Sequence, residues 1–233
     1  MPERRVGKAF RSALRADVQL PSVEPRESGV SFLMNPRRLR LFEYVAREPG
    51  VHLRKASREL GVPTQSLRWH VQVLLQAGLL RENKVRGRAA YFCTGLVDET
   101  DDALFICLQD ALNRRIWKAV GDGAPHVQAD LIRRLGTYEQ RVTPHLRWMA
   151  DVGLLAAARE NGHRLYHRAL DVGGMERRYS TDREARESRL LEMLRKQGLA
   201  PRVTARTATT IAVAVSSGRD SVTIRFEVLP LPR

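Results

Sequence analysis

Residues 60–80 of this chain read LGVPTQSLRWHVQVLLQAGLL, and this stretch decides the fold. Gly61 is the residue type that ends a helix in the left-handed conformation, and Val62-Pro63-Thr64 predicts a tight turn after it. Apolar side chains then recur with the spacing of one buried helix face, at Leu67, Val71, Leu74 and Leu75. The stretch therefore predicts the end of one helix, a turn and a second, amphipathic helix that stops at Gly78.

The residues on either side complete a small domain. Upstream, Asn35-Pro36 supplies a cap and a proline for the first helical position, and Glu48-Pro49-Gly50 ends that helix. A short second helix is expected from His52 to Leu60. Downstream, two short strands flank the basic segment NKVRGR of residues 83–88, which predicts a hairpin. Three helices followed by a hairpin form a winged helix-turn-helix.

The chain repeats itself with a period of 75 residues. Sliding the sequence by that period aligns Leu60-Gly61 with Leu135-Gly136, and Gly78-Leu79-Leu80 with Gly153-Leu154-Leu155. The same offset keeps apolar character at core positions, as in Leu41/Ile116, Phe42/Trp117, Val71/Leu146 and Leu74/Met149. This self-similarity predicts two copies of one module.

Two segments of the first copy carry a recognisable pattern, LRWHV at residues 67–71 and LLQAGLL at residues 74–80. They resemble the winged helix-turn-helix regulators of archaea related to the ArsR and MarR groups, whose recognition helix ends in H-L-x-x-L-x-x-x-G-L. The second copy resembles this pattern less fully, through His145-Leu146, Met149 and Val152-Gly153-Leu154-Leu155. The resemblance implies a DNA-binding transcription regulator.

The charge balance indicates a polyanionic partner. The chain has 40 Lys and Arg against 26 Asp and Glu, a net charge of +14, and only five of the 40 are Lys. Arg binds phosphate and guanine edges with a planar fork, so an excess of Arg points to nucleic acid. RNA stays open beside DNA, because the same charge attracts either polymer.

Composition also excludes several classes of protein. The longest run of apolar residues and glycine, Val152 to Ala158, has seven residues, whereas a membrane span needs roughly 20. The N-terminus lacks the apolar stretch of a secretory signal, and Cys93 and Cys107 are expected as buried apolar side chains. No nucleophile elbow, phosphate loop or H-E-x-x-H motif occurs. We therefore expect a cytoplasmic, nucleoid-associated protein that is not an enzyme and has no cofactor, metal or small-molecule ligand.

If the first copy docks as such modules usually do, the start of its third helix enters the major groove. The helical phase leaves one set of side chains outward, namely Gln65, Ser66, Arg68, Trp69 and Gln72. Gln can pair with adenine and Arg with guanine, whereas Ser66 suits a phosphate, and Trp69 either stacks at the interface or belongs partly to the core. On the wing, Lys84, Arg86 and Arg88 are expected at phosphates or in the minor groove, with a solvated turn as the alternative.

The second copy departs from the first at one position. Pro144 stands where the first copy has Trp69, and proline is tolerated only near a helix start, so its recognition helix should begin no earlier than about Gln140. The outward residues expected on this helix and its wing are Gln140, Arg141, Thr143, Arg147, Arg159, His163 and Arg164. Residues 105–170 hold ten basic and six acidic side chains, against 12 and four in residues 35–96. We therefore expect the second copy to bind DNA more weakly or to serve as a protein-protein surface.

Histidines occupy equivalent places in the two copies. His70 and His145 each precede a buried position, while His163 and His167 are four residues apart on an expected strand. Neither pattern offers the partners of a metal site. We expect structural histidines, with contact of His70 or His145 to a backbone phosphate as the alternative.

The sequence divides into a basic arm, the first copy, an acidic linker, the second copy and a C-terminal piece, at residues 1–34, 35–96, 97–109, 110–170 and 171–233. The arm either follows DNA or is a tail. In the linker, Thr100 or Asp101 is expected to cap a helix that runs into the second copy, and the acids are expected to be solvated or to screen basic surface.

The C-terminal piece predicts one helix and three strands. Thr181-Asp182 can cap the helix, and alternating apolar residues between Val203 and Val228 indicate the strands. Such a piece has a thin core, so we expect it to pack against a partner copy or the second module. It serves either for dimerisation or as a structural cap.

Together these features predict a mainly α protein with small β parts, of the α+β class. It contains two tandem winged helix-turn-helix domains and a C-terminal αβββ piece. The expected function is transcription regulation through binding of double-stranded DNA, with a homodimer as one possible assembly. The alternatives are an architectural or replication-associated DNA-binding protein without strong sequence specificity, and a winged-helix module for protein interactions.

Overall fold

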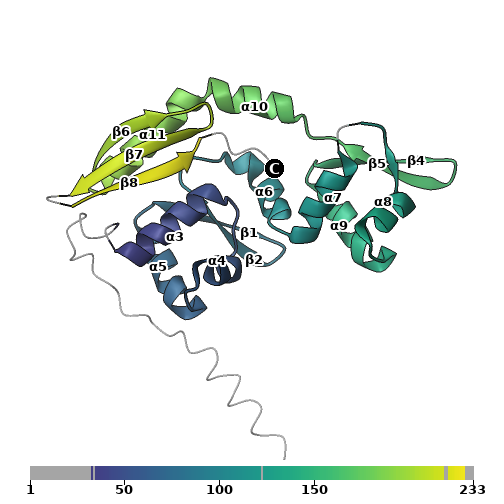
Figure 1. Cartoon of the computed structure of the whole chain (residues 1–233), viewed down its shortest axis with the longest axis horizontal. Helices are drawn as coiled ribbons and strands as arrows, with labels where there is room; N and C mark the ends of the chain where they lie inside the picture. Colours follow the sequence, from purple (N-terminus) through teal and green to yellow (C-terminus); the bar gives the residue numbers. More distant parts are fainter. Residues whose placement is uncertain (1–32, 34, 122, 218–219, 229–233) are drawn as a thin grey trace, which may run out of the picture.

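The structure is a computed structural model that describes residues 33, 35–121, 123–217 and 220–228 (Figure 1). The predicted N-terminal arm lies outside the described residues, apart from the buried Leu33. The described chain consists of a first unit, a linker, a second unit and a C-terminal part, at residues 35–93, 94–110, 111–168 and 171–228. None of the described helices combines the length and the apolar character that a membrane crossing requires.

The first unit contains three helices and a hairpin. Its elements are α3 (Pro36–Arg47), α4 (Leu53–Leu60), α5 (Thr64–Gln76), β1 (Leu80–Val85) and β2 (Arg88–Cys93). The Asn35 side chain caps α3 by accepting hydrogen bonds from two amides of its first turn. Gly61 ends α4 with a φ of 64°, and Val51 forms an isolated antiparallel bridge with Tyr91 of β2. The core positions predicted for α5 are buried, at Leu67, Val71 and Leu74.

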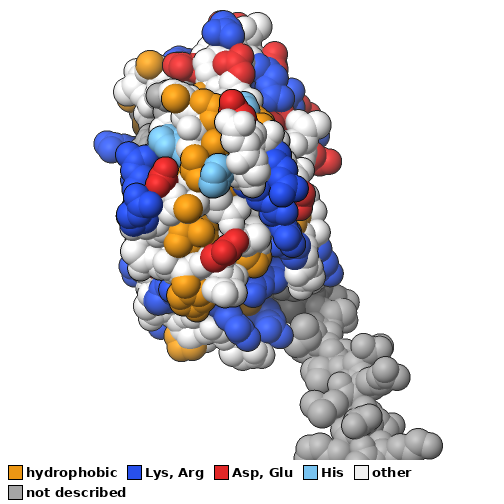
Figure 2. Space-filling model, turned by 90° about the vertical axis from the view of Figure 1, so that its right-hand side faces the viewer, with side chains coloured by type: hydrophobic (Ala, Val, Ile, Leu, Met, Phe, Trp, Pro, Cys, Tyr) orange, Lys and Arg blue, Asp and Glu red, His pale blue; other side chains and the backbone are white. Residues whose placement is uncertain are grey.

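The second unit has the same order of helices and strands. Its elements are α7 (Ala111–Val120), β3 (His126–Val127), α8 (Gln128–Leu135), α9 (Glu139–Asp151), β4 (Leu155–Glu160) and β5 (His163–Arg168). The elements α8, α9, β4 and β5 begin and end 75 residues after α4, α5, β1 and β2. The pair His126 and Tyr166 takes the place of Val51 and Tyr91. Figure 2 views the molecule from this end, where Lys and Arg side chains form separate groups with hydrophobic side chains and histidines between them.

Helix α9 begins within one residue of the predicted limit. It starts at Glu139 and contains Pro144 within its second turn. Proline removes the backbone hydrogen bond that would reach Gln140. Because Gln140 is exposed, its carbonyl lies near the solvent-accessible start of the helix and the helix continues through Pro144.

The linker forms its own short helix. It contains the single turn η1 (Glu99–Asp101) and α6 (Asp102–Leu108), whose apolar side chains are buried between the two units. Gly50 has a φ of 78°, and a Cβ atom there would lie 3.0 Å from the backbone nitrogen of Ile106, so glycine permits α6 to approach the first unit. The predicted continuous helix into the second unit is wrong. Asp110 starts α7 separately by accepting the Leu112 amide at 2.8 Å.

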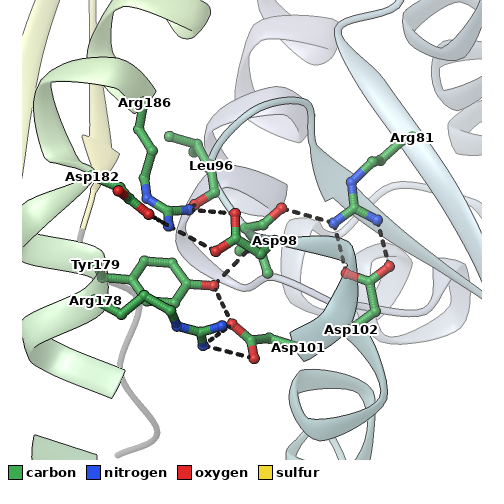
Figure 3. A network of polar contacts seen from close by, with 10 residues as sticks. Arg81, Leu96, Asp98, Asp101, Asp102, Arg178, Tyr179, Asp182 and Arg186 are labelled. Atoms are coloured by element: carbon green, nitrogen blue, oxygen red, sulfur yellow. Dashed lines mark hydrogen bonds and ion pairs between the residues drawn. The ribbon is translucent and has the colours of Figure 1, made fainter. Parts of the chain in front are cut away.

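Three acidic residues of the linker, Asp98, Asp101 and Asp102, are paired with distant side chains. We call this set of contacts the linker network, formed by Asp98, Asp101, Asp102, Arg81, Arg178, Tyr179 and Arg186 (Figure 3). The fully buried Arg186 donates to both carboxylate oxygens of Asp98, at 2.9 and 2.7 Å. These bonds hold the pKa of Asp98 below its ordinary value. The Tyr179 hydroxyl donates to Asp101 at 2.7 Å.

This pairing explains why the predicted cap of the linker helix is absent. The side chains of Thr100 and Asp101 form no capping hydrogen bond with α6. The Asp101 carboxylate instead accepts hydrogen bonds from Arg178 and Tyr179 of the C-terminal part. The expected solvated acidic block is therefore the point where the C-terminal helices attach.

The C-terminal part contains two helices and a sheet. Its elements are α10 (Val172–Thr181), α11 (Arg183–Lys196), β6 (Ala200–Arg206), β7 (Thr210–Ser217) and β8 (Asp220–Glu227). The three predicted strands are confirmed and form an antiparallel sheet in the order β6-β7-β8. The prediction of a single helix is wrong, because α10 precedes the predicted helix α11. Asp171 caps α10 by accepting a hydrogen bond from the Gly174 amide at 2.7 Å. The pair Gly173-Gly174, with its low helix propensity, concealed this helix.

The sheet packs against the first unit. Alternate side chains fill its buried face, at Ile211, Val213, Val215, Ile224 and Phe226. Phe226 of β8 meets Phe42 of α3 edge to face, with 5.8 Å between ring centroids, and α11 packs beside β6. Contrary to the prediction, the C-terminal part therefore covers the first unit, with β8 over α3 in Figure 1. This apolar face of the sheet is therefore buried within the chain.

Candidate nucleic-acid interface

Helix α5 presents one polar face to solvent. The five side chains predicted on this face are all exposed, at Gln65, Ser66, Arg68, Trp69 and Gln72. The opposite face carries Leu67, Val71 and Leu74 into the core, and this burial fixes which side chains point outward. Trp69 is 47% exposed, so it belongs to the surface and not to the core. The arrangement brings hydrogen-bonding groups, a cation and an aromatic ring onto less than three helical turns.

Arginines of α3 lie beside this face and were absent from the predicted set. The Arg38 guanidinium is 5.1 Å from the centre of the Trp69 ring, which rests edge-on against His70. Burial, together with the nearby Arg38 and Arg37, lowers the pKa of His70. His70 is only 5% exposed, which argues against contact with a phosphate. The signal for the arginines was available in the run Arg37, Arg38 and Arg40 at the start of the first helix.

The predicted wing residues do not act as one group. Arg86 and Gly87 form the turn of the first hairpin, with φ values of 52° and 73°. The Arg86 guanidinium lies 4.6 Å from the centre of the Trp148 ring and 3.8 Å from a carboxylate oxygen of Asp151, both on α9. Lys84 instead lies 3.5 Å from Glu82 of its own strand. The hairpin tip therefore contacts the second unit, while 52% of the Arg86 side chain stays exposed.

A cleft separates the first hairpin from α9. It encloses about 560 Å³ and is lined by Arg86 and Arg88 of the hairpin. Its other cations were not among the predicted site residues, namely Lys55, Arg58 and Arg114. Lys55 and Arg58 are three residues apart on α4, a spacing that places them on one helix face and could have been recognised in the sequence.

The second unit gathers most of its predicted residues around a hollow of about 470 Å³. The predicted residues that line it are Thr143, Arg147, Arg159, His163 and Arg164, whereas Gln140 and Arg141 are exposed outside its lining. Thr143 is half-buried, and its hydroxyl accepts a hydrogen bond from Gln128 at 3.1 Å. This bond occupies Thr143 within the unit and corrects its assignment as a fully outward residue. Glu139 and Gln128 also line the hollow, so its charge is mixed.

The other reactive side chains are placed inside the fold. Cys93 and Cys107 are buried free thiols, and burial raises the pKa of Cys107 to about 12. Nδ1 of His145 lies 2.7 Å from the Asn113 side-chain oxygen. Within the described ranges, no cluster of three or more His, Cys, Asp or Glu side chains could hold a metal ion.

Comparison with known proteins bears on the first unit. Residues 35–104 match a sequence family described as an N-terminal HTH domain. The three helices and the hairpin of the first unit lie within this match. An uncharacterized HTH-type transcriptional regulator of Methanocaldococcus jannaschii is 23% identical over 135 residues, which are 58% of this chain and 34% of that protein. The chain therefore spans about a third of the length of this relative.

Proposed function

We propose that this protein regulates transcription by binding double-stranded DNA, with the HTH domain as its main reading element. The observation that carries the proposal is the exposed face of α5. Its glutamines and Arg68 offer the donor and acceptor geometry that reads adenine and guanine in the major groove. The helix that ends at Gly61 and the turn before α5 are the arrangement in which a recognition helix enters that groove.

The second unit acts as a second winged helix. Its support is the 75-residue spacing of helices and strands and the hollow that contains Arg147, Arg159 and Arg164. The tip of its hairpin is exposed, so these arginines can reach phosphates beside the site bound by the first unit. Two linked modules bind more tightly than either alone, because the second binding step is intramolecular. The protein then works in the cytoplasm at the nucleoid and needs no catalytic group.

Selection of bound sequences from a random duplex library, at about 150 mM salt, tests the proposal. We expect an enriched motif, and Gln65→Ala is expected to relax one position of that motif while leaving the salt dependence of binding unchanged. Gln76→Ala, at the exposed end of the same helix, is the matched control. Salt-sensitive binding without a motif would instead indicate an architectural DNA-binding protein.

A complete absence of duplex binding would overturn the proposal. The exposed α5 face would then be a surface for a protein partner. A parallel titration with an RNA duplex distinguishes the two polymers, since the RNA major groove is too narrow for α5 to read.

A further inference from the structure

The cleft between the two units has the size of a small-molecule site. Its volume of about 560 Å³ lies within the range of about 300–1,000 Å³ that ligand pockets occupy. Its walls come from α4, the first hairpin, α6, the start of α7 and the middle of α9.

Positive charge in this cleft exceeds negative charge. Its lining contains five cations and one carboxylate, which are Lys55, Arg58, Arg86, Arg88, Arg114 and Asp110. Three of these cations are paired with carboxylates outside the lining, namely Lys55 with Glu48, Arg58 with Glu59 and Arg86 with Asp151. Asp110 is engaged in capping α7, where it accepts the Leu112 amide. Within the described part of the chain, Arg88 has no ion-pair partner, and the Arg114 guanidinium contacts only the Leu108 carbonyl, at 3.4 Å. These two planar forks suit the paired oxygens of a phosphate.

Two histidines in the cleft lining are each oriented by a hydrogen bond at Nδ1. Nδ1 of His52 lies 2.6 Å from the Ala89 carbonyl oxygen, and Nδ1 of His145 lies 2.7 Å from the Asn113 side-chain oxygen. Both oxygens accept hydrogen bonds, so the Nδ1 proton is held there and Nε2 is the ring atom left for another group.

The remaining lining is apolar and includes an aromatic ring. Val85, Ile106, Pro144 and Trp148 lie among the cations, so the cleft offers both an anion-binding side and an apolar side. We infer that this cleft binds a small phosphorylated molecule with a ring system, which is the chemistry of a nucleotide. The inference does not depend on the proposed regulation, because the binding can be measured without DNA.

Calorimetric titration of the full chain with ATP, inorganic pyrophosphate and adenosine, at about 150 mM salt, tests this inference. We expect saturable binding of one ATP per chain, weaker binding of pyrophosphate and the weakest binding of adenosine. Arg88→Gln and Arg114→Gln are each expected to weaken ATP binding by about tenfold, the effect of losing one charge-assisted contact. Arg195→Gln removes the same charge from the exposed end of α11, outside the cleft, and is expected to change the affinity by less than about twofold.

Tryptophan fluorescence adds a readout of location. ATP is expected to change the emission of the natural chain and of Trp69→Phe, but not that of Trp148→Phe, because only Trp148 lines the cleft. Circular dichroism of each variant verifies that it is folded. The inference is wrong if no probe binds saturably, if Arg195→Gln weakens ATP binding as much as Arg88→Gln, or if the arginine variants lose affinity for duplex DNA while the natural chain binds no ATP.

Discussion

The hairpins of the two units have the same turn geometry but different surroundings. Both have a two-residue turn with consecutive left-handed residues, Arg86-Gly87 in the first unit and Asn161-Gly162 in the second. Asparagine adopts this conformation with little cost, whereas arginine rarely does. Arg86 is held there while its guanidinium stacks on Trp148. The same turn thus gives a hairpin that joins the units and another whose tip is exposed.

The two units also differ in how much of their surface is covered by the rest of the chain. The first unit is covered by the C-terminal sheet through Phe42 and Phe226, and the linker network ties it to α10 and α11. The second unit contacts α6 and the tip of the first hairpin. The first unit is therefore anchored on several sides by the C-terminal part. The second unit, with the same order of helices and strands, is attached through fewer contacts, and its hairpin stays exposed.

Replacing the buried arginine of the linker network tests this difference between the units, and we expect it to have the largest effect on stability. We expect Arg186→Met to lower the free energy of unfolding by about 2–4 kcal/mol, because Asp98 loses its partner while only 32% of its side chain is exposed. Hydrogen exchange should show lost protection in α10, α11 and the sheet, and retained protection in α8 and α9. Arg177→Met, which breaks an exposed pair with Asp171, is expected to cost less than about 0.5 kcal/mol. Equal loss of protection in both units would contradict the asymmetry.

The next largest effect is expected from substitutions that compare how α5 and α9 contribute to DNA binding. Arg68→Ala is expected to weaken binding to the selected motif by about 1–3 kcal/mol, because a guanine contact is lost. Arg147→Ala in α9 is expected to weaken binding by less than about 1 kcal/mol and equally for all sequences, since we assign it to phosphate. Competition with mutated operators measures both effects. A larger, sequence-dependent loss with Arg147→Ala would reverse the roles of the two units.

Exchange of the turn residues would sharpen the comparison of the hairpins. Asn161→Arg is expected to destabilise the second unit by about 1 kcal/mol, because the left-handed conformation is costly for arginine and the described structure places no ring beside it. Arg86→Asn should leave stability within about 1 kcal/mol of the natural chain, since relief of strain offsets the lost stacking. It should also shift the emission of Trp148. Chemical denaturation and fluorescence provide the two measurements, and a large loss with Arg86→Asn would mean that the contact itself holds the units together.

The smallest effect concerns pH. The pKa of His70 is lowered from 6.5 by burial and by its arginine neighbours, so the unfolded chain takes up a proton that the folded chain resists. Stability should therefore fall as the pH decreases below about 6.5 and level off below the folded pKa. His70→Gln should remove this slope, and His145→Gln, at the equivalent place of the second unit, should retain it. Urea midpoints at pH 5 and 7 measure the difference.

Local features of the fold could be predicted because they depend on neighbours in sequence. The 75-residue spacing of Leu60-Gly61 and Leu135-Gly136 anticipates where α8 and α9 lie, and the helical phase of Leu67 and Val71 already identifies the exposed face of α5. Alternating apolar residues likewise predict β7 and β8.

Features that depend on distant partners could not be predicted. Asp98 and Asp101 looked like a solvated block, since nothing in their local sequence indicates Arg186 and Tyr179 as partners. The position of Arg86 against Trp148 depends on how two domains are oriented, and no periodicity encodes that orientation. The cleft combines side chains from five elements, so its cations become one site only after the chain has folded.

The packing of the last strand on the first helix sets an order of events during synthesis. Phe226 leaves the ribosome about 180 residues after Phe42, a delay on the order of 10–40 s at typical elongation rates. During that interval the HTH domain is made but its α3 surface is uncovered, whereas the second unit already has all of its own strands. The nascent chain therefore displays an apolar surface near its beginning until translation is almost complete, and a chaperone that shields this surface would favour correct maturation.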